Sequence, residues 1–141
     1  MKDKKYQIFI SSTYEDLKEE RELVQKAILE MYHFPIGMEM FSAGDSEQWE
    51  IIKETIDSSD YYVLIIGHRY GSIDGEGISY TEKEYDYAKA KGIPTLAFIR
   101  DRNAPVSEAI EKVQNQIRKS LMLLLIKQKR ICAIFGHQKK N

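Results

Sequence analysis

Apolar residues along this chain alternate between short continuous runs and runs with helical spacing. The first run, Tyr6–Ile10, predicts a strand, and the apolar positions that follow, from Tyr14 to Met31, predict a helix with one buried face. The pattern then repeats, with a strand predicted at Met38–Phe41 and a helix at Ser46–Ser58. The amino-terminal half of the chain therefore indicates two strand–helix units in succession.

The centre of the chain carries the strongest strand signal. Tyr61–Ile66 is a run of apolar and aromatic residues without alternation, which is typical of a parallel strand covered on both faces. A third helix is predicted at Thr81–Lys91, ended by Gly92 and Pro94, and a fourth strand follows at Thr95–Ile99. We therefore take Tyr61–Ile66 as the central strand of a sheet.

Regular alternation of strands and helices predicts an α/β fold in three layers. We expect a short parallel sheet of four strands in the order 2-1-3-4, with right-handed crossovers and helices on both faces. In such sheets, ligands bind beyond the carboxyl ends of the strands, where the strand order reverses. The loops that follow the predicted strands are therefore the places to search for chemistry.

Composition excludes several classes of partner. The 141 residues suit one domain, and 21 Lys and Arg against 22 Asp and Glu create no overall field, so we expect neither nucleic acid nor membrane as a partner. Leu121–Ile126, the longest apolar run, is far shorter than the ~20 residues that cross a bilayer. Cys132 is the only cysteine, which excludes an internal disulfide and favours a cytoplasmic location.

The first candidate binding segment is Ser11-Ser12-Thr13, which follows the first predicted strand. Hydroxyl groups and free backbone N–H groups at a helix start can hold a phosphate or a carboxylate. The same residues also fit a simple helix cap, because Glu15 and Asp16 lie three positions after Ser12 and Thr13. The two roles do not exclude each other.

The second candidate segment is the turn after the central strand, Gly67–Ser72. It offers Arg69 to clamp a phosphate and Tyr70 to stack on a base, with His68 beside them. An ordinary glycine-rich loop is an equal alternative. No second His or Cys stands at metal-ligand spacing and no phosphate-loop motif occurs, so we expect neither a metal nor a resident cofactor.

The third candidate segment begins the third predicted helix, at Ser79, Tyr80, Thr81 and Glu82. Glu84 is the candidate catalytic residue, because a carboxylate here could accept a ribose hydroxyl or stabilise an oxocarbenium-like cation. Glu82 is the second candidate, Ser79 is a candidate binding residue, and Tyr80 could stack on a base. The alternative is a purely structural role, in which Thr81 and Glu84 form a capping box at the start of the helix.

Four stretches of the sequence together resemble the signature blocks of the "domain of unknown function 4062" family. They are Ile8–Arg21, Phe34–Phe41, Asp60–Ser72 and Gly77–Tyr87. The resemblance covers about residues 5 to 107 and departs from the family pattern at His68. That family is similar to TIR domains and nucleoside deoxyribosyltransferases, which implies a flavodoxin-like, TIR-like three-layer fold.

The resemblance also bears on Glu84. TIR domains carry a glutamate in a Ser-x-Trp-Cys-x-x-Glu context, and Tyr80 to Glu84 has the spacing of its Trp-Cys-x-x-Glu part, with Tyr80 and Thr81 in place of Trp and Cys and Ser79 one position nearer than the motif's Ser. Nucleoside deoxyribosyltransferases have a similar Glu-Ile-Gly-Tyr-Ala segment, which aligns from Glu84 with Asp86 replacing the Gly. Both likenesses therefore imply a role for the same carboxylate.

The resemblance leaves two kinds of function open. The first is a TIR-like signalling module of antiviral or stress-response systems, which binds a nucleotide, self-associates, or docks to a larger signalling protein. The alternative is an N-glycosidase that cleaves NAD or a nucleoside with Glu84. In either case NAD or a nucleotide would be a ligand or substrate rather than a resident cofactor.

The last segment of the chain departs from the pattern. We expect residues 1–107 to form the TIR-like domain and residues 108–141 to form an atypical tail, helical or poorly ordered, with the fifth strand missing. Read in a shifted frame, the codons of residues 109–141 permit a different amino-acid sequence that would supply a helix and a strand. This suggests a truncated or frameshifted copy of the family domain. The alternative is a genuine family variant with a different tail. An uncovered edge strand and a Leu-rich tail predict self-association.

Overall fold

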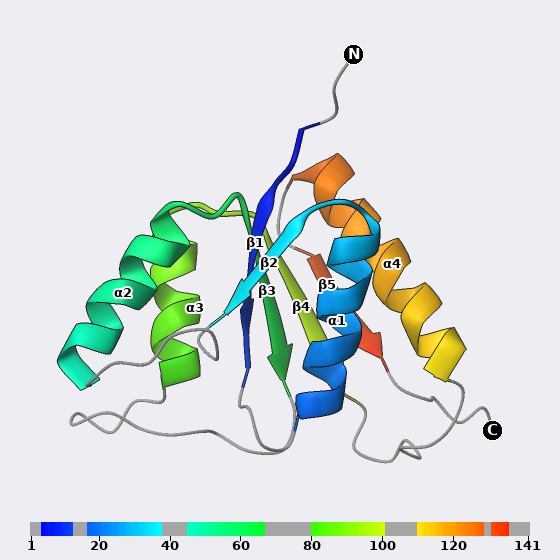
Figure 1. Ribbon diagram of the computed structural model, residues 1–141, viewed down its shortest axis with the longest axis horizontal. Helices are drawn as coiled ribbons and strands as arrows, with labels where there is room; N and C mark the ends of the chain where they lie inside the picture. Colours follow the sequence, from blue (N-terminus) through cyan, green and yellow to red (C-terminus); the bar gives the residue numbers. More distant parts are fainter. Residues whose placement is uncertain are drawn as a thin grey trace.

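The structure is a computed structural model that describes residues 4–12, 17–37, 45–66, 80–100, 110–128 and 131–135. Within these ranges, strands and helices alternate along the chain (Figure 1). The elements are β1 (Gln7–Ser11), α1 (Lys18–Glu30), β2 (Phe34–Gly37), α2 (Asp45–Asp57), β3 (Tyr61–Ile66), α3 (Tyr80–Ala90), β4 (Thr95–Arg100), α4 (Ile110–Lys127) and β5 (Ile131–Phe135).

All strands of the sheet are parallel, in the order β2-β1-β3-β4-β5. The predicted order 2-1-3-4 of the first four strands is confirmed. The expectation that the fifth strand is missing is wrong, because β5 pairs with β4 from Leu96↔Ile131 to Arg100↔Phe135. The run Ile-Cys-Ala-Ile-Phe is short and β-prone, and it follows a helix closely enough to complete another β/α unit.

The second strand lies earlier than its predicted position. β2 is Phe34–Gly37, whereas the whole predicted strand Met38–Phe41 lies outside the described residues. The chain turns directly after α1 at Tyr32, which has a φ of 65°, and Phe34 N–H then donates to the Tyr6 carbonyl at 2.8 Å. Pro35 is tolerated because β2 is an edge strand.

Each face of the sheet carries two helices (Figure 1). Ile8 and Ile10 of β1 face α1 and α4, while Phe9 faces α2 and α3. This alternation follows from the two-residue period of a strand. The predicted central strand β3 is buried on both faces from Tyr61 to Ile65. The two cores therefore share the sheet and hold its carboxyl edge in place.

The position of α4 departs from the expected crossover rule. The connections β3–α3–β4 and β4–α4–β5 run in the same direction across the sheet but use opposite faces. They therefore have opposite hands, and the expectation that every crossover is right-handed is wrong for one of them. On its face, α4 packs beside α1 and buries Ile117, Leu121 and Leu124 together with Leu96 and Phe98 of β4. Without α4, one helix would have to cover this whole face.

α4 has 18 residues and carries the Leu-rich segment of the tail. Its apolar residues divide between the core and the surface, since Leu121 and Leu124 are fully buried while Met122 and Ile126 are exposed. Across the described ranges, no helix combines the length and apolar character needed to span a membrane. α4 is therefore a packed surface helix of this domain.

Candidate functional site at the carboxyl edge of the sheet

The strand order reverses at the centre of the sheet. From β1 the chain crosses through α1 to β2 on one side, and from β2 it crosses back through α2 to β3 on the other side. The switch point therefore lies between β1 and β3, whose carboxyl ends meet where Ser11 pairs with Leu64. Open α/β sheets bind ligands at such a point.

Ser11 and Glu84 meet at this switch point. Ser11 is the last residue of β1 and faces the α2–α3 side, and Glu84 reaches it from the second turn of α3. The Ser11 hydroxyl donates a hydrogen bond to Glu84 Oε1 at 2.5 Å. Both side chains are buried, with 1% and 4% of their surfaces exposed. A carboxylate held in the core thus has a hydroxyl donor from the neighbouring strand.

Tyr62 of β3 borders the same pair. Its ring is fully buried and stacks against Phe9 at a centroid distance of 5.6 Å with 6° between the ring planes. Burial and the neighbouring Glu84 carboxylate raise the pKa of Tyr62 well above its usual value of 10.0. The phenol therefore stays protonated at neutral pH and adds no second negative charge beside Glu84.

Arg21 reaches the same edge from the other face of the sheet. It lies on α1 with only 4% of its surface exposed, and its Nη1 donates to Ser12 Oγ at 2.6 Å. Arg21 is not among the site residues that the sequence predicted. A signal was present, because Arg21 occupies a helical position on the buried stripe formed by Leu17, Val24 and Ile28. A charge on an apolar stripe is costly unless it is paired or functional.

The two serines connect the two buried ionisable groups. Ser11 faces Glu84, and the next residue, Ser12, accepts from Arg21. A carboxyl group and a guanidinium therefore flank the end of β1 from opposite helical layers. A carboxylate can accept hydrogen bonds from sugar hydroxyls, and a guanidinium can bind phosphate or carboxylate oxygens. The arrangement has the chemistry to hold a polar ligand that contains both hydroxyl and anionic groups.

The structure brings together part of the predicted site. Ser11, Ser12 and Glu84 lie at one edge, as expected from the β/α order. Glu82 lies exposed on α3, away from the buried position of Glu84. Tyr80 is the first residue of α3, but its side chain is not among the described parts of the structure.

The remaining predicted residues lie outside the described residues. They are Thr13, His68, Arg69, Tyr70 and Ser79. Their predicted roles in phosphate binding and base stacking stay predictions.

The alternative explanations by helix capping do not match the helix ends. α1 begins at Lys18 with Leu17 at its N-cap position and no side-chain cap hydrogen bond, so Ser12 does not cap it. Thr81 lies inside α3 rather than before it, and Glu84 instead accepts from Ser11. The capping-box interpretation of Thr81 and Glu84 is therefore wrong, which leaves the burial of the carboxylate to be explained.

The described residues hold no group of three or more His, Cys, Asp and Glu side chains that could bind a metal ion. The chemistry available at the described part of the edge is therefore that of a carboxyl group, hydroxyls, a phenol and a guanidinium.

Comparison with known proteins places the chain in a family. The family model described as "Domain of unknown function (DUF4062)" matches residues 7–140. The chain belongs to this family. The match extends past residue 107, where the resemblance seen in the sequence ends, and its range includes α4 and β5.

Solved structures support the fold of this DUF4062 domain. It is similar to a protein described as a prokaryotic SEFIR domain, with a TM-score of 0.51 and 18% sequence identity over 84% of this chain and 89% of the other. The SEFIR domain has a TIR-like fold, so the expected TIR-like architecture is confirmed. The comparison with curated proteins found no match.

Proposed function

We propose that this DUF4062 domain is a TIR-like signalling module that binds a nucleotide at the carboxyl edge of its sheet. The observation that carries the proposal is the buried Glu84 carboxyl group, held by Ser11 at the switch point between β1 and β3. This is the position at which α/β sheets bind their ligands. A nucleotide offers ribose hydroxyls for Glu84 and phosphate oxygens for a guanidinium such as that of Arg21.

The cost of burying Glu84 supports a role beyond packing. Removing a carboxylate from water costs several kcal/mol, and apolar residues at such positions are often as stable or more stable. A hydroxyl donor reduces this cost without removing it. Ionisable groups buried at a ligand-binding edge are therefore good candidates for functional residues.

The same carboxylate supports a catalytic version of the proposal. A glutamate beside the ribose of NAD or a nucleoside would stabilise positive charge at the anomeric carbon as the N-glycosidic bond breaks. Tyr62 stays neutral beside it and would not compete for that charge. The catalytic version requires turnover, whereas the binding version does not.

Ligand binding tests the proposal directly. The purified domain is titrated with NAD, ADP-ribose, ADP and adenosine by calorimetry and thermal shift, alongside Glu84→Gln. The matched control is Glu82→Gln, which changes the same chemical group at an exposed position of the same helix. We expect Glu84→Gln to weaken binding at least about tenfold and Glu82→Gln to leave it unchanged.

Two results would contradict the proposal. Either no nucleotide binds to the wild-type domain, or Glu84→Gln binds as tightly as wild type. Chromatography of the same mixtures separates binding from catalysis, because release of nicotinamide or free base by wild type, lost in Glu84→Gln, assigns the N-glycosidase activity. Binding without release leaves the signalling module as a nucleotide sensor.

A second candidate function is protein interaction without a small ligand. Large apolar side chains stand exposed near the ends of α1 and α4, among them Tyr32 and Ile126 with 73% and 71% of their surfaces accessible. Exposed apolar groups that form a contiguous patch mark interaction surfaces. Such a module, in a cytoplasmic antiviral or stress response, would dock to a larger signalling protein or to itself. Glu84→Gln would leave that interaction intact.

A further inference from the structure

Two isoleucines lie side by side where β3 and β4 reach the carboxyl edge of the sheet. Ile66 and Ile99 are partners in the register of these parallel strands. Ile66 has 42% of its surface exposed, although β3 is buried from Tyr61 to Ile65, and Ile99 is half-buried. Neither isoleucine is a member of the two cores that the described residues form. The pair therefore offers apolar surface at this edge, and we call it the Ile66–Ile99 platform.

The platform lies on the α2–α3 side of the sheet. Leu64 of β3 and Ala97 of β4 pack in the core on that side, and Ile66 and Ile99 follow them by two positions. The two-residue period of a strand directs both isoleucines to the same side. Ser11, which donates to the buried carboxylate of α3, faces this side as well. The platform and the carboxylate therefore share one face and one edge.

The spacing allows one ligand to contact both the platform and the carboxylate. Ser11 pairs with Leu64 across neighbouring strands, which lie ~4.8 Å apart in a sheet. Ile66 is two residues further along β3, roughly 7 Å beyond Leu64. A nucleoside has this length, so a ligand with its ribose hydroxyls at Glu84 extends its base over the platform.

The two parts of the edge have complementary chemistry. Ligand sites combine apolar walls with a few polar groups that fix the orientation of the ligand. Ser11 and Glu84 supply polar groups, and the platform supplies apolar surface. A planar aromatic base gains from contact with aliphatic side chains, because apolar surface of both partners leaves water. A sugar phosphate without a base has no group that gains in this way.

We propose that the Ile66–Ile99 platform binds the aromatic base of the ligand, which makes the ligand a nucleoside or a nucleotide rather than a sugar phosphate. The inference rests on the proposed nucleotide site and assigns each part of that ligand a contact. The ribose lies at Glu84, and the base lies on the two isoleucines. Ile66, the more exposed of the two, is then the residue that determines the preference for ligands with a base.

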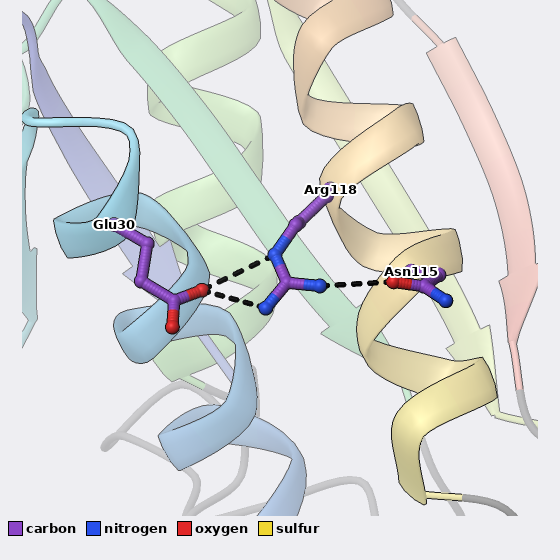
Figure 2. Close-up of polar contacts among 3 residues, drawn as sticks. All are labelled: Glu30, Asn115 and Arg118. Atoms are coloured by element: carbon purple, nitrogen blue, oxygen red, sulfur yellow. Dashed lines mark hydrogen bonds and ion pairs between the residues drawn. The ribbon is translucent and has the colours of Figure 1, made fainter.

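The opposite layer of helices supplies a matched control position. Ile126 of α4 is an isoleucine with 71% of its surface exposed. Its helix is joined to α1 by an ion pair, in which Glu30 Oε1 accepts from Arg118 Nε at 3.1 Å and from Nη2 at 2.8 Å (Figure 2). These two helices cover the face of the sheet opposite to the platform. A substitution at Ile126 therefore changes the same side chain away from the proposed site.

Methyl NMR of the isoleucine-labelled domain tests where the base lies. Adenosine and ADP should shift the methyl resonances of Ile66 and Ile99, because the ring current of a base acts on the groups against which it packs. Ribose 5-phosphate has no ring current and should leave these resonances in place. The Ile126 resonance should not respond to any of the three ligands.

Calorimetry on variants tests the contribution of the platform to affinity. Ile66→Thr keeps the β-branched shape of the side chain but replaces apolar surface with a hydroxyl. It should weaken the binding of adenosine and ADP at least about threefold and leave that of ribose 5-phosphate unchanged. Ile66→Val stays apolar and should remain within about twofold of wild type for every ligand, as should Ile126→Thr. Circular dichroism verifies that each variant is folded.

Three results would overturn the inference and leave the nucleotide proposal standing. In the first, adenosine and ADP bind in a manner that depends on Glu84, but the Ile66 and Ile99 resonances do not move. In the second, Ile66→Thr binds ADP as tightly as wild type does. In the third, Ile66→Thr weakens ribose 5-phosphate as much as ADP. A wild-type domain that binds neither adenosine nor ADP would end both proposals.

Discussion

Ser11 at the end of β1 donates a hydrogen bond to Glu84 of α3, a residue 73 positions later in the chain. The bond ties the carboxyl end of a central strand to the first half of a helix from the next layer. Because Ser11 and Glu84 are both buried, neither group can exchange this partner for water without a local opening of the structure. The pair therefore links the stability of the fold to the geometry of the candidate site.

Ser11→Ala should destabilise the domain by about 1–3 kcal/mol, because it removes a donor from a buried carboxyl group. Glu84→Gln keeps an acceptor for the Ser11 hydroxyl and should cost less than Glu84→Ala. Urea unfolding of Ser11→Ala, Glu84→Ala and the double variant forms a thermodynamic cycle. Its interaction term should be at least about 0.5 kcal/mol.

Additivity of the two substitutions in that cycle would show that the hydrogen bond contributes nothing measurable. The matched control is Ser58→Ala, because Ser58 is an exposed serine at the opposite end of the sheet. Its combination with Glu84→Ala should be additive, since distant sites rarely couple.

Alternation of apolar runs and helical spacings predicted the β/α order, and the expected strand order 2-1-3-4 is confirmed although the second strand lies earlier than predicted. Tyr61–Ile66 in particular admits one explanation, and its burial on both faces confirms it. The site was partly predictable for the same reason, since β/α alternation alone places Ser12 and Glu84 at one edge. The contact between Ser11 and Glu84 depends on the packing angle of α3, which periodicity does not specify.

The sequence misled where local patterns are weak. Ile131–Phe135 is a five-residue strand behind a Leu-rich helix, and its pairing with β4 depends on where α4 packs. The second strand was predicted at Met38–Phe41 instead of Phe34–Gly37 because the Pro suggests a break, whereas an edge strand tolerates it. Arg21 was not predicted as a site residue, although its helical spacing from Leu17, Val24 and Ile28 places it on the buried stripe of α1.

Arg21 provides a second test of the edge. Arg21→Lys keeps the positive charge but loses the planar fork that reaches Ser12 Oγ, so the two residues are not interchangeable there. We expect a loss of about 1.5–3 kcal/mol in the free energy of unfolding, the usual value of a hydrogen bond to a charged group. Urea unfolding measures it, with Lys26→Ala as the control at an exposed position of the same helix. A lysine variant as stable as wild type would assign the guanidinium no structural role.

His33 makes the edge strand β2 sensitive to pH. The backbone N–H of Tyr6 donates to His33 Nδ1 at 3.1 Å, which requires that nitrogen to be unprotonated, and the Tyr6 ring lies 5.2 Å from the imidazole. Burial first, and the positive charge of Lys5 second, lower the pKa of His33 from its usual 6.5. The unfolded chain therefore binds this proton more readily than the folded domain does.

The free energy of unfolding should consequently fall as the pH drops below about 6.5 and through the folded pKa of His33. Above about pH 6.5 the contribution of neutral His33 to stability should be fully present. His33→Gln retains an acceptor for Tyr6 N–H but does not titrate. Thermal unfolding between about pH 8 and about pH 5 should show a smaller loss for this variant than for wild type. Parallel curves for the two proteins would assign the pH dependence to other groups.

Substitutions in α4 measure how much the carboxyl-terminal segment contributes to the stability of the core. Leu121 is fully buried against the sheet, while its neighbour Met122 has 53% of its surface exposed. Leu121→Ala should destabilise the domain by about 2–5 kcal/mol, because it removes buried methyl groups and leaves a cavity. Met122→Ala should change the free energy of unfolding by less than about 0.5 kcal/mol at protein concentrations where the domain is monomeric. Equal, small effects at both positions would mean that α4 does not pack on the sheet, and the two-helix layer on that face would then be wrong.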